Sequence, residues 1–318
     1  MKLSAILPVA RVLRRELAVT ALLLLGVSAV VFTVLQFAPG DPLNVLLEGQ
    51  SPRSQQAVRE ALGVSHSWHG RYGAWLARVV QGDFGSSIRT GLPVLPELAR
   101  VGVNTLYLTL GSLLLTLLIA VPIAVHAAVN GDTPGNTVAT VAAYIVSAVP
   151  VFWFGYIVVY VFIHYFGMFP LLSGAAAKQE HAWLYFLVPI FVLGTASGTL
   201  SELIRHLRVE LSRVLAEDYI RTARAKGAPV WRHAFKEGFL IPVTELMSAK
   251  IPFLLGGAVI VEQVFNWPGM GRMAWQAAQD RDFPVIMGIA LLAAAFVRAG
   301  NLLQRVVFTM VNPRASKA

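Results

Sequence analysis

The 318-residue chain contains no cysteine, and this absence excludes disulfide bonds, thiolate metal sites and thiol catalysis. Charged residues are also scarce, since they make up 14% of the chain, whereas soluble domains carry about 25%. Hydrophobic residues make up 56% of the chain, and the mean hydropathy is +0.63. A net charge of +9 would suggest nucleic-acid binding in a soluble protein. In a membrane protein, such an excess is more often Lys and Arg retained on the cytoplasmic side, so the composition predicts an integral membrane protein.

Long apolar runs recur along the chain and are long enough to cross a bilayer, which takes about 20 residues. The first run follows a basic start and ends without a small-residue cleavage site, so it indicates an uncleaved span rather than a signal peptide. We expect an all-α integral membrane protein with about six transmembrane helices. The expected spans are residues 17–38, 101–129, 137–166, 182–204, 240–264 and 284–310.

Two connecting segments are long or strongly charged. Residues 39–100 are polar and rich in turn-forming residues, and Leu76–Val80 predicts a short amphipathic helix within them. Residues 205–236 carry eight basic side chains, which marks them as a cytoplasmic loop. Six spans with that loop inside place both termini in the cytoplasm and segment 39–100 in the periplasm. The expected organisation is a cytoplasmic start with the first span (1–38), a periplasmic loop (39–100), a transmembrane core (101–310) and a cytoplasmic tail (311–318).

The basic loop between the fourth and fifth expected spans has a pattern of its own. Residues 211–227 predict an amphipathic helix that stops at Gly227, and residues 230–239 predict a second short helix after the turn at Ala228-Pro229. Two short helices projecting from a bundle would let a soluble partner move the spans. On charge alone, a solvated basic loop that only sets topology is an equally good interpretation.

Several motifs resemble those of one transporter family. The segment Ala216–Gly227, A-E-D-Y-I-R-T-A-R-A-K-G, is similar to the EAA loop of ABC-importer permeases, in the form used by dipeptide, oligopeptide and nickel permeases. Further matches lie in the order that this family would place them, at 38–42 (A-P-G-D-P), 81–87 (Q-G-D-F-G-S-S), 261–271 (V-E-Q-V-F-N-W-P-G-M-G) and 281–284 (R-D-F-P). The chain departs from the family in a short interval from Gly227 to Pro242, in Arg305 at a usually acidic position and in an N-P-R ending.

The resemblance implies the permease subunit of an ATP-driven importer in the bacterial inner membrane, and not an enzyme. A second homologous permease would complete the pore, two cytoplasmic ATPase subunits would hold ATP and Mg, and an external binding protein would deliver the substrate. The chain has no phosphate-binding G-x-x-x-x-G-K-[ST] motif of its own. Peptides are the expected cargo, with nickel, glutathione and opines as alternatives. The residues implied in docking to a groove of the ATPase are Tyr219, Arg221, Thr222, Ala223, Lys226 and Gly227, and the small Ala223 would allow a close approach.

Charged residues inside expected spans are candidates for function, because a charge at membrane depth is costly. Glu245, Lys250 and Arg298 are candidate pore-lining residues, and Glu245 and Lys250 could pair with each other. We expect Glu202 and Glu262 nearer the membrane interfaces. Trp153, Trp183 and Trp267 lie near expected span ends, as in an aromatic belt.

Two other functional classes compete with the importer. An intramembrane protease would use Ser197 in G-T-A-S-G as its nucleophile, although small residues there also favour tight helix packing. A secondary transporter would work alone and draw on an ion gradient. Neither class requires a metal site or a cofactor in this chain, and the sequence predicts none.

Overall fold

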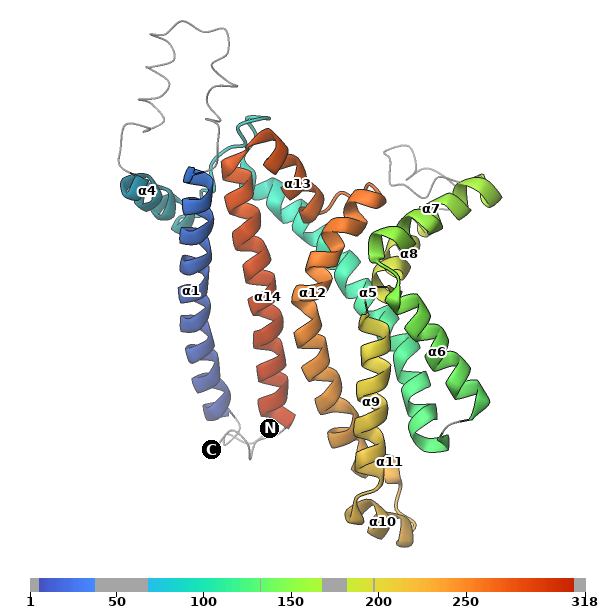
Figure 1. The fold of residues 1–318 in the computed structure, drawn as a ribbon. Helices are drawn as coiled ribbons and strands as arrows, with labels where there is room; N and C mark the ends of the chain where they lie inside the picture. The colour runs from blue at the N-terminus through green and yellow to red at the C-terminus, as the bar shows by residue number, and fades with distance from the viewer. Residues whose placement is uncertain (1–5, 38–67, 132, 168–181, 197, 312–318) are drawn as a thin grey trace, which may run out of the picture. The chain divides into compact units, whose positions relative to one another are not determined.

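A computed structural model describes residues 6–37, 68–131, 133–167, 182–196 and 198–311 (Figure 1). Within these residues the chain is helical and forms no strand. The described residues fall into two compact units, and the division cuts through several long helices. The first unit takes in residues 6–17, 104–272 and 297–311, and the second takes in residues 18–103 and 273–296. Residues 312–318 of the expected tail and residues 39–67 of the expected loop lie outside the described residues.

The helices account for nearly all of the described chain. They are α1 (Ile6–Phe37), α4 (Trp68–Val80), α5 (Val94–Asn130), α6 (Pro134–Ala148), α7 (Val151–Phe166), α8 (Ala182–Thr195), α9 (Thr199–Leu215), α10 (Asp218–Ala225), α11 (Val230–Ala234), the π-helix η3 (Phe235–Leu240), α12 (Ile241–Val264), α13 (Met270–Asp280) and α14 (Phe283–Val311).

Membrane-spanning length is reached in two ways. Three helices, α1, α5 and α14, are each long and apolar enough to cross a membrane. Three further pairs of helical segments are each bent at a short break. They are α6 with α7, α8 with α9, and the segment Glu237–Pro252, from η3 into α12, with the rest of α12, Leu255–Val264. If each pair is one span, the total is six. The all-α membrane fold is therefore as predicted from the sequence. The helix boundaries differ in places, since α5 begins at Val94 and α9 continues to Leu215.

The bends have local causes in the sequence. Between α6 and α7 the axis turns by 100°, because Val149 precedes Pro150 and is held extended at φ −74° and ψ 129°. Between α8 and α9 it turns by 56°, and Gly198 takes a left-handed φ of 79° there. The 55° bend within α12 lies next to Pro252.

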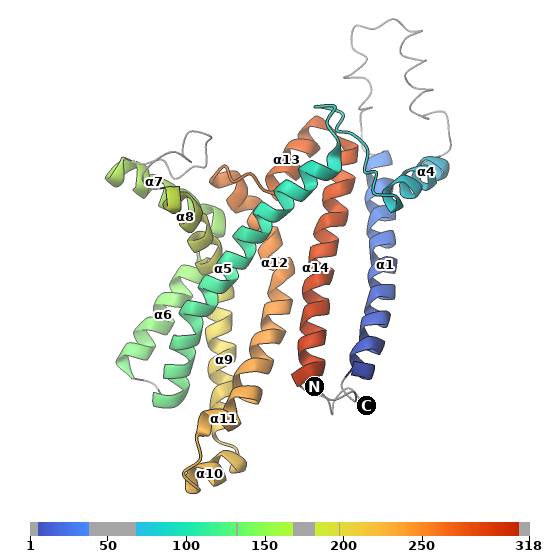
Figure 2. The same ribbon diagram turned by 180° about the vertical axis from the view of Figure 1, so that it is seen from behind.

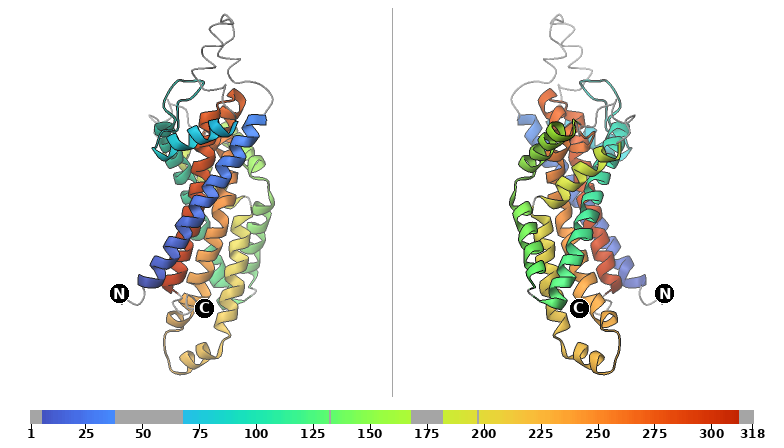
Figure 3. Two further views of the ribbon diagram at one scale, coloured as in Figure 1. Left: turned by 90° about the vertical axis from the view of Figure 1, so that its left-hand side faces the viewer. Right: turned by 90° about the vertical axis from the view of Figure 1, so that its right-hand side faces the viewer.

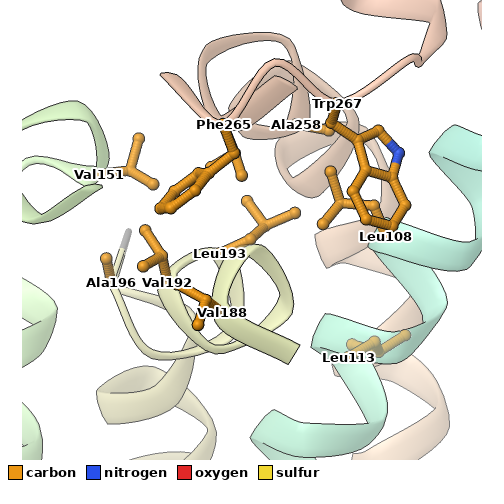
Figure 4. Packing of buried hydrophobic residues seen from close by; sticks show 11 residues of the cluster. Leu108, Leu113, Val151, Val188, Val192, Leu193, Ala196, Ala258, Phe265 and Trp267 are labelled. Atoms are coloured by element: carbon orange, nitrogen blue, oxygen red, sulfur yellow. The ribbon is translucent and has the colours of Figure 1, made fainter. Parts of the chain in front are cut away.

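The core of the first unit is an apolar cluster contributed by α5, α7, α8 and α12 with the segment that follows it. Figure 4 shows Phe265 and Trp267 packed with side chains from these helices. The buried members are Leu108, Leu113, Val151, Val188, Val192, Leu193, Ala196, Ala258, Val261, Phe265 and Trp267. Trp267 is thus a core residue and not the interfacial tryptophan that its position suggested, whereas Trp153 and Trp183 are exposed.

Small residues allow α5 and α8 to approach closely. A Cβ added to Gly194 would lie 2.7 Å from the Ser112 carbonyl oxygen, and the Thr116 hydroxyl donates a hydrogen bond to the Gly194 carbonyl at 2.6 Å. The small-residue stretch therefore serves tight packing, which was one of its two expected roles. Ser197, the nucleophile of the protease alternative, lies outside the described residues. Figure 2 shows α5 crossing α8 and α6 from the other side.

The second unit joins two of the motifs that lie far apart in sequence. Asp282 is buried, and its Oδ2 accepts hydrogen bonds from the Ser87 hydroxyl at 2.5 Å and the Arg89 backbone N–H at 3.3 Å. The turns before Ser87 require left-handed backbone at Gly82 and Gly85, with φ of 84° and 80°. The Q-G-D-F-G-S-S and R-D-F-P motifs therefore form one structural element. The amphipathic helix predicted at Leu76–Val80 is present as the end of α4, which begins at Trp68.

Candidate functional site

The basic loop between α9 and α12 folds into two short helices, α10 and α11. Figures 1 and 3 show both beyond the ends of α9 and α12, to which the loop is joined. The single helix predicted over 211–227 is interrupted, because Glu217 is extended at φ −65° and ψ 147° and forms the N-cap of α10. Asp218 follows in the first turn of α10, where its negative charge complements the helix dipole.

Gly227 ends α10 in a Schellman motif. Its φ of 66° is left-handed, a conformation that glycine adopts without steric cost. The Ala228 N–H donates to the Ala223 carbonyl at 2.9 Å, and the Gly227 N–H donates to the Arg224 carbonyl at 3.1 Å. These two bonds satisfy carbonyl groups that the helix end would leave free. Pro229 then prevents the helix from continuing. The stop predicted at Gly227 is confirmed.

One face of α10 holds the loop to the end of α9. Ile220 is fully buried at 0% exposure and packs with Val214 of α9 and Ala234 of α11, flanked by Leu215 and Val230. This apolar cluster fixes α10 and α11 against α9 without help from a partner. The apolar residue at every third or fourth position was the sequence signal for this face, although the docking residues inferred from resemblance did not include Ile220.

The other face of α10 is polar and exposed. Tyr219, Arg221, Thr222 and Lys226 all have exposed side chains. Tyr219 donates a hydrogen bond to Glu237 Oε2 at 3.3 Å. Partial burial, and after it the negative charge of Glu237, raises the pKa of the Tyr219 phenol above its ordinary value, so this donor stays protonated at neutral pH.

Two further contacts organise this polar face. Arg221 forms an exposed ion pair with Asp218, with Nη1 3.3 Å from Oδ1, and Thr222 donates to the Asp218 carbonyl at 2.9 Å. Ala223 differs from the other implied docking residues, because it is only 6% exposed. Its small side chain packs inside the loop, and its expected part in a close approach to a partner's groove stays a prediction.

Comparisons with known proteins place this loop in a family. Residues 120–317 match the family described as "Binding-protein-dependent transport system inner membrane component", and residues 9–96 match its N-terminal companion family. The chain is 37% identical over 317 residues to the oligopeptide transport system permease protein AppB of Bacillus subtilis (strain 168), covering 96% of this chain and 98% of that protein. It is 33% identical over 293 residues to the glutathione transport system permease protein GsiC of Escherichia coli (strain K12), covering 90% and 92%.

The chain is an ABC importer permease of this family. The family's permeases are multi-pass inner-membrane proteins that work with ATPase and substrate-binding partners. They are not enzymes themselves, since separate ATPase subunits hydrolyse the ATP. The structural features that remain are therefore features of a permease, and the charged residues within its helices are of particular interest.

A buried carboxylate organises the W-P-G-M-G motif of the permease. Glu262, near the end of α12 and at 0% exposure, accepts hydrogen bonds from the Thr105 hydroxyl at 2.6 Å and the Arg272 backbone N–H at 2.9 Å. Thr105 in turn accepts from the Met270 N–H at 2.7 Å. A Cβ on Gly269 would overlap the Glu262 carboxylate, so only glycine fits there. We call Thr105, Glu262 and Gly269 with the backbone of 270–272 the Glu262 clasp.

The candidate pore-lining charges are held in different ways. Lys250 forms an ion pair with Glu202 across α12 and α9, and not with Glu245 as we considered. Glu202 is correspondingly a partner in a helix-to-helix contact. Glu245 is exposed on α12, which keeps it available to line a pathway.

Arg298 takes part in a buried ion cluster. Its Nη2 lies 2.6 Å from Oε2 of Glu16 on α1, and Arg305 Nη1 lies 2.7 Å from the other carboxylate oxygen, Oε1. Glu16 is 3% exposed and Arg298 12%. Since Arg298 and Arg305 are seven residues apart, they share one face of α14, and Glu16 lies between them. Arg298 therefore ties α14 to α1, and its guanidinium is committed to this contact.

Proposed function

We propose that the permease forms half of the translocation pathway of an ATP-driven importer and that α10 is its contact with a cytoplasmic ATPase. In this proposal both termini and the α9–α12 loop face the cytoplasm, and the segment between α1 and α5 faces the periplasm. A second homologous permease completes the pathway. Two ATPase subunits bind ATP and Mg, and a periplasmic or lipid-anchored protein delivers the substrate.

The observation that carries this proposal is the division of α10 into two faces. The apolar face is occupied by α9 and α11, so α10 keeps its position without a partner. The polar face, with Tyr219, Arg221, Thr222 and Lys226, remains exposed. A loop that only set topology would need its positive charges, but it would not need a capped helix anchored by a fully buried isoleucine.

The anchoring also suggests how force is transmitted. Ile220 and Val214 join α10 to the end of α9, and the Lys250–Glu202 ion pair joins α9 to α12. A displacement of α10 by an ATPase would therefore act on both spans together. Coupling of this kind requires that ATPase closure and pathway opening favour the same state of the bundle.

Peptides are the proposed cargo. Relatives named for oligopeptide transport and for glutathione transport cover more than nine-tenths of this chain, and glutathione is itself a short peptide. Nickel and opines remain the alternatives. Competition between a labelled tripeptide, Ni²⁺ and an opine for the binding protein that co-purifies with the permease would decide among them.

The absence of cysteine provides a direct test of the docking proposal. Thr222→Cys places a single thiol on the exposed face of α10, and Arg78→Cys places one on an exposed position of α4. In whole cells, a membrane-impermeant thiol reagent added outside should label the Arg78→Cys variant and leave the Thr222→Cys variant unlabelled. In the purified importer, a short thiol-to-amine crosslinker should join the thiol on α10 to an ATPase subunit. Labelling of the α10 thiol from outside, or absence of the crosslink, would contradict the proposal.

A further inference from the structure

Three aromatic residues, Trp231, Phe235 and Phe239, follow one another at intervals of four positions along α11 and η3, and we call them the aromatic column. Trp231 and Phe235 are 43% and 48% exposed. The rings of Phe235 and Phe239 stack, with centroids 5.3 Å apart and an interplanar angle of 29°. Phe239 is partly buried and packs against an apolar cluster of the first unit that includes Leu203 and Leu207. The column therefore begins at the core and continues outward into two exposed rings.

A π-helix carries the inner part of this column. On an α-helix, positions four apart lie within about 40° of each other because each turn holds 3.6 residues, and they remain neighbours on the wider π turn. Pro242 lacks the N–H that would bond to the Gly238 carbonyl, and its ring crowds that carbonyl. The backbone widens just before it, over Phe235–Leu240. Gly238 also packs closely on α9, where an added Cβ would lie 3.2 Å from Leu211 Cδ2.

The column crosses one end of a candidate span. That span is formed by the end of η3 and by α12, and its first half begins at Glu237. Phe239 therefore lies inside the span, Phe235 lies two residues before it and Trp231 six residues before it. At 1.5 Å per residue, Trp231 is at most about 9 Å beyond the span. The headgroup layer on each side of the hydrocarbon core is about 5–8 Å thick. Phe235, at most about 3 Å beyond the span, falls within that layer, and Trp231 falls at its outer edge.

The chemistry of the column differs from that of the neighbouring α10. The outward face of α10 offers hydroxyl and cationic groups, whereas the column offers an indole and a phenyl ring flanked by the exposed Arg232 and His233. Tryptophan, whose apolar ring carries a polar N–H, concentrates in membrane interfaces, and the adjacent Arg232 complements anionic lipid headgroups.

We propose that Trp231 and Phe235 insert into the lipid headgroup layer and hold α11 at the membrane surface. The α9–α12 loop would then have two surfaces with different partners, lipid for the aromatic column and protein for α10. A loop fixed to the membrane on one side can transmit a displacement of α10 into α12 without swinging freely. An ATPase groove that covers the aromatic column is the competing occupant.

Site-directed spin labelling distinguishes these occupants, since the chain has no cysteine of its own. Nitroxide labels would be attached singly to Trp231→Cys and Phe235→Cys in the full importer complex, with Thr222→Cys as the reference for a position covered by the ATPase. The complex would be held in nanodiscs of phosphatidylcholine and phosphatidylglycerol. Collision rates with oxygen, which partitions into lipid, and with a water-soluble nickel chelate would then be compared.

The proposal predicts a several-fold higher ratio of oxygen to nickel collisions at positions 231 and 235 than for the same nitroxide free in buffer. A ratio equal to that of the free label would place the column in water and overturn the proposal. Shielding from both reagents would place it under the ATPase and overturn the proposal equally.

A second measurement needs only a conservative change. Trp231→Phe keeps an aromatic ring, and the emission lost on this substitution belongs to Trp231. In nanodiscs of brominated phosphatidylcholine, that component should be quenched by at least half relative to nanodiscs of ordinary phosphatidylcholine. If the emission of Trp231 were not quenched by the brominated lipid, the proposal would be overturned. This measurement does not depend on whether the labelled cysteine variants assemble.

Discussion

Two glycines, Gly227 and Gly269, follow helices of the permease for opposite physical reasons. Gly227 has a left-handed φ of 66°, and nothing lies within 4 Å of an added Cβ. Gly269 has no such φ, but its added Cβ would overlap the carboxylate of Glu262. The first glycine is required by its backbone conformation, and the second by the space around it.

The difference shows how each region is specified. The Glu262 clasp is defined by contacts between distant residues, so any atom added there disturbs a buried hydrogen-bonded carboxylate. The α10 loop projects from the bundle, and its turn is encoded by the residue at the turn itself. A substitution that only needs room for a side chain should therefore be costly at Gly269. A substitution that cannot adopt a left-handed backbone should be costly at Gly227.

The largest effect is expected at the clasp. Gly269→Ala should destabilise the permease by about 3 to 5 kcal/mol, because the added Cβ displaces a buried charge from its hydrogen-bond donors. The thermal unfolding midpoint of the purified protein measures this change. Gly256→Ala is the matched control, since an added Cβ there meets nothing within 4 Å and an alanine is favoured in the helix.

A double variant tests the cause of that loss. Removing the displaced carboxylate with Glu262→Ala should make the cost of adding Gly269→Ala much smaller, so the two effects should not add. Simple additivity would mean that Gly269 is needed for a reason unrelated to Glu262.

The second effect concerns another contact between distant residues, the ion cluster at Glu16. Glu16→Gln should destabilise the permease by about 2 to 3 kcal/mol, because it removes the negative charge that pairs with the buried Arg298. Arg305→Gln should cost less than about 1 kcal/mol, since Arg305 is half exposed. Unfolding midpoints of the two variants compare them directly, and equal losses would contradict the asymmetry in burial.

The third effect separates the two glycines by conformation. Gly227→Val should cost about 1 to 2 kcal/mol through backbone strain and should lower substrate-stimulated ATP hydrolysis by the importer. Gly227→Asn should restore most of that activity, because asparagine tolerates the left-handed conformation. If valine and asparagine behaved alike in the ATPase assay, the left-handed turn would not be the feature that matters.

The smallest effect is expected at Tyr219. Tyr219→Phe removes the single hydrogen bond to Glu237 from an exposed face, so the free energy of unfolding should fall by less than about 1 kcal/mol. The thermal unfolding midpoint measures this change. Crosslinking of Thr222→Cys to the ATPase should persist in this background. A large loss of stability would show that the α10 face depends on this bond.

Much of the fold could be predicted from the sequence because hydropathy and glycine act locally. The apolar runs located the helices, and Gly227 located the end of α10. The breaks were harder to foresee, since Pro150 and Gly198 interrupt runs that remain apolar on both sides. Hydropathy averages over such residues, and only the backbone geometry shows that two helices meet there.

The partners of the charged residues could not be predicted for a different reason. Lys250 and Glu202 are 48 residues apart, and Glu16 and Arg298 are 282 apart. Pairing across such distances depends on how the helices pack, and no local pattern encodes it. The docking residues of α10 came from family resemblance, which identified the loop but could not show that Ala223 points inward.

The π-helix at Phe235–Leu240 makes this segment tolerant of a single-residue deletion. A π turn holds about one residue more than an α turn. Deleting one residue there would convert a π turn into an α turn, and each would still complete one full rotation. The angular phase between α11 and α12 would therefore be kept, whereas deleting one residue from a regular α-helix would rotate everything before it by about 100°. The segment thus acts as a reserve of one residue between the loop and α12.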